Sequence, residues 1–109
     1  MIRTSGQELI AAGIGQIYVH DVREDGTNIV ISSVTTDSRH AGEGSAFVAI
    51  KGERVDGHDF VGSLDDAALA VVDHLIDNTH IPQLLVEDTV KALGDIESIN
   101  IEKRRMYAH

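Results

Sequence analysis

The sequence of 109 residues contains no cysteine. This absence excludes disulfide bonds, thiolate metal ligands and cysteine nucleophiles, and it fits a reducing compartment. The chain also has no apolar run near the roughly 20 residues needed to cross a bilayer, and its first residues lack the apolar region of a signal peptide. We therefore expect a cytoplasmic protein without a membrane span.

Basic residues are scarce. Nine Lys and Arg face 18 Asp and Glu, which gives a formal net charge of −9. An acidic chain repels a polyphosphate backbone and an anionic lipid surface, so we expect neither nucleic acid nor a membrane as a partner. A small anionic ligand remains compatible with this charge, because backbone N–H groups and one local Arg can hold a phosphate.

Several catalytic motifs are missing. The chain has no "GxSxG", no "GxxxxGK[ST]" and no "HExxH", so a hydrolase elbow, a phosphate loop and a zincin helix are excluded. Two groups of histidines and acids occur: Asp56, His58 and Asp59, and then Asp73, His74, Asp77 and His80. Their ligands would have to converge from separate loops, so we expect no metal site, and no acid–base pair can be nominated as catalytic.

What the chain does have is the composition of one ordinary globular domain, with 42% hydrophobic and 25% charged residues. Ser5 and Glu8 fit a capping box that starts a helix over 6–12. The run "SAFVAI" is apolar on both faces and is typical of a central strand. The expected strands are 17–19, 28–34, 45–50, 68–73 and 83–88, and "REDGT" is expected to form the turn between the first two. Further helices are expected at 60–68 and after Asp88.

Strands that alternate with helices predict an α/β fold, a single small domain whose mixed sheet has about four to five strands and flanking helices. Two polar loops follow expected strands, "TTDSR" and "KGERVDGHDF". α/β proteins usually bind ligands at strand ends, and Ser38, Gly52 and Arg54 suit an anionic ligand there. The alternative is that Asp37 only caps local N–H groups and that Arg54 is a solvated surface charge.

The order of the motifs is more specific than any one of them. "VTTDSR", then "G-x-x-FVA-x-KG-x-x-x-DGHDF", then "AVV" and "LLVEDTVKALG", resembles the N-terminal domain of the Mur ligase family of peptidoglycan synthesis over about residues 30–105. The resemblance implies a three-domain parent enzyme. Residues 1–95 would be its UDP-MurNAc-binding N-terminal domain, and 96–109 would begin the connecting helix to an ATPase domain absent from this chain. ATP and Mg²⁺ would act only in the intact enzyme, so this chain is expected to be inactive alone and to hold no cofactor.

The resemblance also implies roles for the two loops. The residues expected to contact the uridine diphosphate portion are Thr36, Ser38, Gly52, Glu53, Arg54 and Val55. The residues expected to hold the loops in shape are Asp37, Arg39, Asp56, Gly57 and His58. In particular, a buried pair of Asp37 and Arg39 would preorganise Ser38.

Within the family, "FVAIKGERVDGHDF" looks most like the branch that adds D-alanyl-D-alanine to UDP-MurNAc-tripeptide. The expected partners are then UDP-MurNAc-peptide and the other two domains of the parent chain. One alternative is the branch that adds the third residue, a diamino acid. Another is a free-standing interaction domain that keeps the fold without the ligand. One departure, "LDDAALAVV" where relatives show "A-x-x-x-GA", leaves the length of the helix at 60–68 open.

Overall fold

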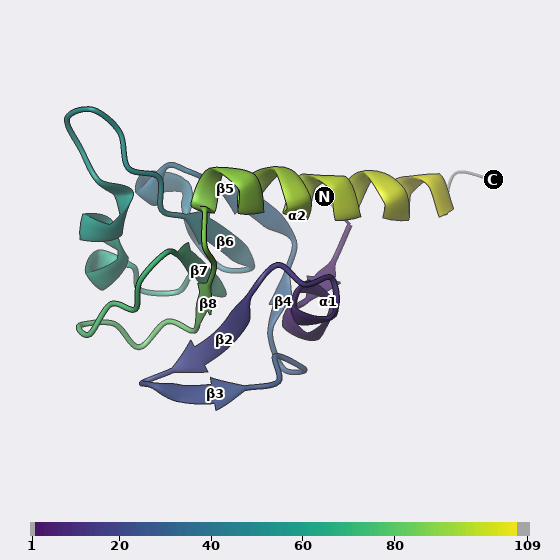
Figure 1. Cartoon of the computed structure of the whole chain (residues 1–109), viewed down its shortest axis with the longest axis horizontal. Helices are drawn as coiled ribbons and strands as arrows, with labels where there is room; N and C mark the ends of the chain where they lie inside the picture. Colours follow the sequence, from purple (N-terminus) through teal and green to yellow (C-terminus); the bar gives the residue numbers. More distant parts are fainter. Residues whose placement is uncertain (1, 107–109) are drawn as a thin grey trace.

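The computed structural model describes residues 2–106, which form a six-stranded mixed sheet with two α-helices (Figure 1). The elements in chain order are β1 (Thr4–Ser5), α1 (Gly6–Ala11), β2 (Gln16–Val19), β3 (Val22–Glu24), β4 (Val30–Ile31), β5 (Ser33–Thr35), the 3₁₀ helix η1 (Ser38–His40), β6 (Ser45–Val48), the 3₁₀ helix η2 (Gly57–Ser63), β7 (Leu69–Val72), β8 (Gln83–Leu85) and α2 (Thr89–Met106). The strand order of the main sheet is β3-β2-β8-β7-β6-β5, and β1 pairs with β4 in a separate ribbon.

Four neighbouring strands of the sheet are parallel. β5, β6, β7 and β8 lie side by side in chain order, in a register that pairs Val34 with Ala46 and Phe47 with Ala70. β2 is antiparallel to both β8 and β3. Because the carboxyl ends of parallel strands meet at one edge, the loops that follow these four strands leave the sheet from the same side.

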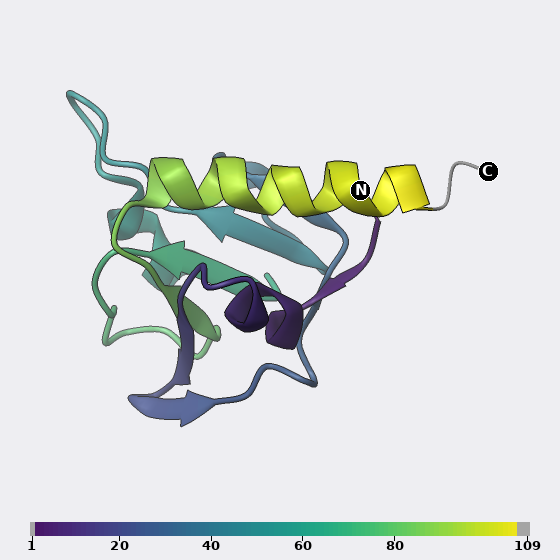
Figure 2. The same cartoon turned by 45° about the vertical axis from the view of Figure 1, so that its right-hand side comes forward.

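Both faces of the sheet are covered, so the central strands are buried throughout. Val48 and Val71 pack with Leu9 of α1 and Ile96 of α2 on one face, and Figure 2 shows α2 lying across that face. Phe47 and its neighbours on the opposite face pack under η2 and the adjoining loops. Alternate residues of a strand point to opposite faces, so a strand covered on both sides is apolar at every position, as predicted for 45–50 and 68–73.

The two helix starts expected from the sequence are confirmed. Ser5 Oγ accepts a hydrogen bond from Glu8 N–H at 3.2 Å, and Asp88 Oδ1 accepts one from Val90 N–H at 2.9 Å. The helix expected at 60–68 is wrong in type and position, because the chain forms the 3₁₀ helix η2 over Gly57–Ser63. This turn begins early because Asp56 caps it.

The α/β class is confirmed, but two strand assignments differ. The turn expected at "REDGT" is confirmed for its second half, where Asp25 Oδ1 accepts from Thr27 N–H at 3.0 Å and Gly26 has a φ of 76°. Its first half is wrong, since β3 extends through Glu24 and His20 and Asp21, with φ of 49° and 68°, form the hairpin turn before it. Positive φ at two non-glycine residues is the geometry of a type I′ turn. The strand expected at 28–34 is split at Ser32, whose N–H donates to Gly44 O at 2.7 Å. The additional strand β3 gives the sheet six strands, whereas β4 pairs with β1 outside it.

Helix α2 is fixed to the domain beyond the expected boundary at residue 95. Ile96 is fully buried, Asn100 Oδ1 accepts from Ile2 N–H at 2.9 Å, and Lys103 Nζ donates to Arg3 O at 2.8 Å. The packed unit therefore continues to at least Lys103. The assignment of the remaining helix as a linker stays a prediction, and 107–109 lie outside the described residues. Among 2–106, no helix, α2 included, is long and apolar enough to cross a membrane.

Ile96→Ala should lower the free energy of unfolding by about 2–4 kcal/mol, because it opens a cavity under α2. The matched control is Ile101→Ala on the same helix, where the side chain is 52% exposed and the change should stay within about 0.5 kcal/mol. Denaturant titration measures both. Equal effects of the two substitutions would contradict the packing of α2 on the sheet.

Candidate functional site

The loop after β5 is shaped by an aspartate. Asp37 N–H donates to Thr35 Oγ1 at 3.0 Å, and Asp37 Oδ1 accepts from Arg39 N–H at 3.0 Å. A short carboxylate reaches the N–H two residues further on and so starts a turn. This bond begins η1 and places Ser38 at the carboxyl edge of the sheet.

The loop after β6 is built in the same way. Asp56 Oδ1 accepts from His58 N–H at 3.0 Å, which begins η2. Gly57 lies against the end of β6, where its N–H donates to Ile50 O at 2.9 Å. A Cβ at position 57 would lie 2.7 Å from Ile50 N, so only glycine fits and the loop folds back toward the first one.

A cavity of about 500 Å³ lies between the two loops. Its lining residues are Thr36, Asp37, Ser38, Arg39, Ile50, Gly52, Val55, Gly57 and Phe60. Four of the six residues expected to contact a ligand are therefore brought together. The other two, Glu53 and Arg54, are outside this lining, in the exposed loop that projects from the body (Figure 1).

Sequence reasoning missed two residues of this cavity, Ile50 and Phe60. Phe60 is 40% exposed, although exposing an aromatic ring to water is unfavourable. The signal available in the sequence was a phenylalanine at the end of a polar, glycine-containing loop.

The pair of Asp37 and Arg39 is confirmed, but its expected burial is wrong. Arg39 donates from Nε to Asp37 Oδ1 at 3.0 Å and from Nη2 to Oδ2 at 2.8 Å. The side chain of Arg39 is 84% exposed, because it lies at the mouth of the cavity. Its hydrogen bonds hold the pKa of the Asp37 carboxyl well below its usual range. An exposed pair adds little stability, so its main effect is on loop shape.

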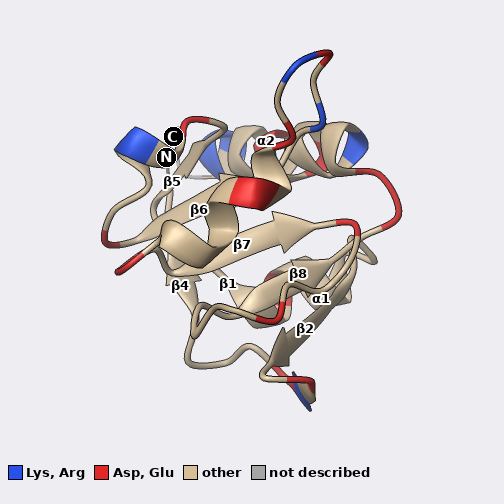
Figure 3. Ribbon diagram, turned by 90° about the vertical axis from the view of Figure 1, so that its left-hand side faces the viewer, with Lys and Arg blue, Asp and Glu red and all other residues tan. Residues whose placement is uncertain are grey.

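A larger cavity of about 640 Å³ lies at the start of α2. Asp73, Glu87, Asp88 and Asp95 line it, and its one lysine, Lys91, pairs with Asp95 at 3.1 Å. Four carboxylates repel an anion. By contrast, the acid that lines the smaller cavity, Asp37, is paired with Arg39, and Figure 3 shows both basic and acidic residues on the projecting loop of 51–55 beside it. The smaller cavity is therefore the better place for an anionic ligand.

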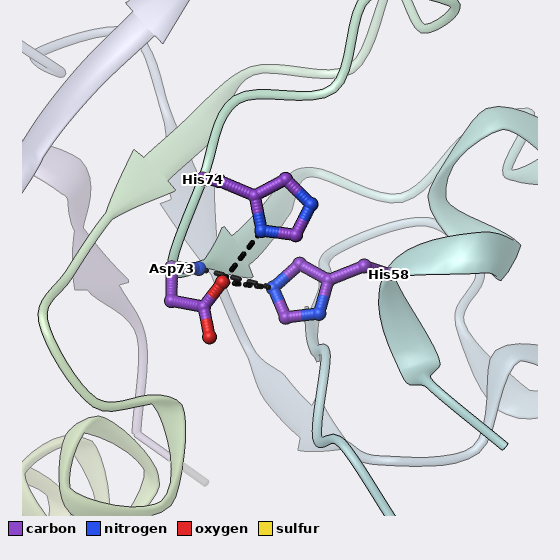
Figure 4. A group of neighbouring side chains, drawn as sticks. All are labelled: His58, Asp73 and His74. Carbon is purple, nitrogen blue, oxygen red and sulfur yellow. Dashed lines mark hydrogen bonds and ion pairs between the residues drawn. The ribbon is translucent and has the colours of Figure 1, made fainter.

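His58 connects the second loop to the end of β7. Its ring is 4% exposed, with Nδ1 at 2.6 Å from Asp56 Oδ1, and Nε2 accepts from Asp73 N–H at 3.0 Å. His74 lies beside it, so the two histidine–acid groups of the sequence meet here (Figure 4). The second loop is thus held by three of the residues expected to shape it: Asp56, Gly57 and His58.

Comparison with known proteins gives the family. Residues 30–102 match the model described as "Mur ligase family, catalytic domain". The chain belongs to the Mur ligase family. Mur ligase relatives include the UDP-N-acetylmuramoyl-tripeptide–D-alanyl-D-alanine ligase of Escherichia coli, 41% identical over 73 residues, or 65% of this chain and 16% of that protein. The UDP-N-acetylmuramoyl-L-alanyl-D-glutamate–L-lysine ligase of Staphylococcus haemolyticus is 45% identical over 67 residues, or 59% and 14%.

Solved structures give the same result. A crystal structure of MurF from Acinetobacter baumannii aligns with a TM-score of 0.78 and 35% identity, over 94% of this chain and 22% of that one. A second aligns with a TM-score of 0.71 and 39% identity, over 84% and 20%. The resemblance noted in the sequence is confirmed, and the chain spans less than a quarter of these Mur ligases.

Arg39→Gln should raise the pKa of Asp37 toward its usual value of 3.8. In the unchanged protein the pKa of Asp37 is lower in the folded state than in the unfolded state. The stabilising effect of the ionised carboxyl is therefore complete above pH 3.8 and is lost as the pH falls through the pKa of the folded state. Carboxyl ¹³C NMR titration measures both pKa values. A pKa near 3.8 for Asp37 in the unchanged protein would disprove the pairing.

Proposed function

We propose that this chain is the UDP-MurNAc-peptide-binding domain of an ATP-dependent peptidoglycan ligase, and that the uridine diphosphate portion binds in the cavity between the two loops. The observation that supports this most directly is the convergence of Thr36, Ser38, Gly52 and Val55 on one cavity at the carboxyl edge of parallel strands. The names of both relatives given above begin with the same UDP-sugar.

The cavity offers two kinds of surface. Thr36 and Ser38 supply hydroxyl groups, and Arg39 supplies a guanidinium at the mouth, which suit phosphate and carbonyl oxygens. Val55 and Phe60, which are 54% and 40% exposed, supply apolar walls for a planar base. Stacking of a base on an aromatic ring is worth roughly 1–3 kcal/mol. We therefore place the uracil against Phe60 and the diphosphate toward Ser38 and Arg39.

In this proposal the chain has no catalytic residue. Its contribution is binding energy at a distance from the reaction: it grips the nucleotide end so that the peptide carboxylate is positioned in the rest of the parent enzyme. ATP and Mg²⁺ would supply the activation of that carboxylate there. A cytoplasmic location stays a prediction from the sequence.

Two branches of the family compete for the substrate. We favour addition of D-alanyl-D-alanine to the tripeptide, supported by the likeness to MurF of Acinetobacter baumannii. Addition of the third residue is the second candidate, supported by the 45% identity to the L-lysine ligase. Because the peptide end would lie outside this domain, we expect the chain to bind UDP-MurNAc-dipeptide and UDP-MurNAc-tripeptide equally. The amine consumed by the intact parent enzyme distinguishes the branches.

Calorimetric titration with UDP-MurNAc-tripeptide, and with UDP alone, tests the cavity. Ser38→Ala should weaken binding about tenfold or more, since one hydrogen bond to a charged group is worth roughly 1.5–3 kcal/mol, and Phe60→Ala should weaken it about tenfold. Arg54→Ala should have a smaller effect than Ser38→Ala, because Arg54 is not among the lining residues.

Controls for this titration lie on helix α2, which contributes no residue to the cavity lining. Ser98→Ala and Val90→Ala each remove an exposed group of similar chemistry and should leave the affinity unchanged. Unchanged affinity in Ser38→Ala and Phe60→Ala would contradict the cavity as the site. No heat at millimolar ligand would favour the free-standing interaction domain instead.

A further inference from the structure

We propose a second site in this chain, for a divalent transition metal of the zinc class, formed by His58, Asp73 and His74. One ligand atom from each residue can be chosen so that all three lie within 4.8 Å of one another. His58 comes from η2, whereas Asp73 and His74 directly follow β7. In the sequence these residues fall in two separate groups, with 15 positions between His58 and Asp73, so no metal site was expected from them.

His58 is held in the state that binds a metal. The carboxylate of Asp56 lies 2.6 Å from His58 Nδ1 and accepts a hydrogen bond from the N–H of that nitrogen. Nε2 accepts a hydrogen bond from Asp73 N–H at 3.0 Å, so this nitrogen carries no hydrogen and its one lone pair points toward Asp73. A metal ion at Nε2 must displace that hydrogen bond. A histidine ligand usually donates its other ring N–H to a carboxylate, as here.

The other two residues, Asp73 and His74, lie directly beside His58. Asp73 Oδ1 lies 3.2 Å from His58 Nε2 and 2.6 Å from His74 Nδ1, so it lies beside the edges of both rings (Figure 4). The rings are stacked, with centroids 4.4 Å apart and an interplanar angle of 20°. Stacked rings do not aim both lone pairs at one ion, so His74 must turn when the metal binds. Its side chain is 60% exposed, which leaves room for that rotation.

The donor set indicates the class of metal. Two imidazoles and one carboxylate, with a fourth position open to water, suit Zn²⁺, whereas Mg²⁺ and Ca²⁺ prefer oxygen ligands alone. The charge around the group also favours a cation. Asp73 lines the larger cavity together with Glu87, Asp88 and Asp95, and Asp56 lies on the other side of His58.

A bound ion would join the start of η2 to the end of β7. It would thereby fix the second loop without contacting Ser38 or Phe60. The proposal does not depend on the nucleotide, because its three ligands lie outside the cavity between the loops.

The experiment is titration of the untagged, chelator-treated full chain with ZnCl₂ alone, followed by calorimetry and by thermal unfolding. We expect one ion per chain and a higher midpoint of unfolding, since a ligand that binds only the folded state stabilises it. His74→Ala and Asp73→Asn should each weaken binding at least tenfold. Asp56→Asn, which changes the partner of His58 Nδ1 and also the cap of η2, should weaken it about 10- to 100-fold.

His40→Gln is the matched control, because His40 is exposed on η1 outside the group, and it should bind zinc as the unchanged chain does. The ¹⁵N resonance of His58 Nε2 reports coordination directly and avoids truncation of a buried side chain. It should shift at one equivalent of zinc. Equal affinity in His74→Ala and in the unchanged chain, or an Nε2 resonance that does not move at saturation, would overturn the proposal.

Discussion

The arrangement of the candidate site depends on two aspartates that fold the loops after adjacent strands. Asp37 and Asp56 each accept a hydrogen bond from the backbone N–H two residues further on. Each also binds the side chain of that same residue, Arg39 Nε at 3.0 Å and His58 Nδ1 at 2.6 Å. The same turn is thus built twice, at the carboxyl ends of two parallel neighbours, and for that reason the loops enclose a cavity between them.

The parallel sheet brings the two aspartate-capped turns close together. The parallel register of β5, β6 and β7 brings the three following loops to one edge, and burial of both faces holds the strand ends in place. Gly57 lets the second loop lie against β6, while His58 ties the same loop to the residues after β7. One loop therefore contributes to the cavity proposed for the nucleotide, through Gly57 and Phe60, and to the proposed metal site, through His58.

The parts predicted from the sequence are those set by local pattern. Continuous apolar runs predicted the central strands, because burial on both faces leaves an apolar residue at every position. Ser5 and Asp88 predicted the helix starts, because capping depends on residues close together in the sequence. The His20–Asp21 turn was missed since non-glycine residues at positive φ carry a weak signal. The approach of Phe60 to the cavity and of His58 to Asp73 depends on contacts between distant segments, which no local pattern records.

The central claim is that the nucleotide binds between the two aspartate-capped loops. Amide ¹H–¹⁵N spectra of the chain, recorded while UDP is added, test it most directly because they report position as well as affinity. We predict that the resonances of Ser38, Gly52 and Phe60 shift along one saturable curve, while those of Gly15 and Asp88 at the acidic cavity stay fixed. Shifts confined to Gly15 and Asp88 would contradict the account.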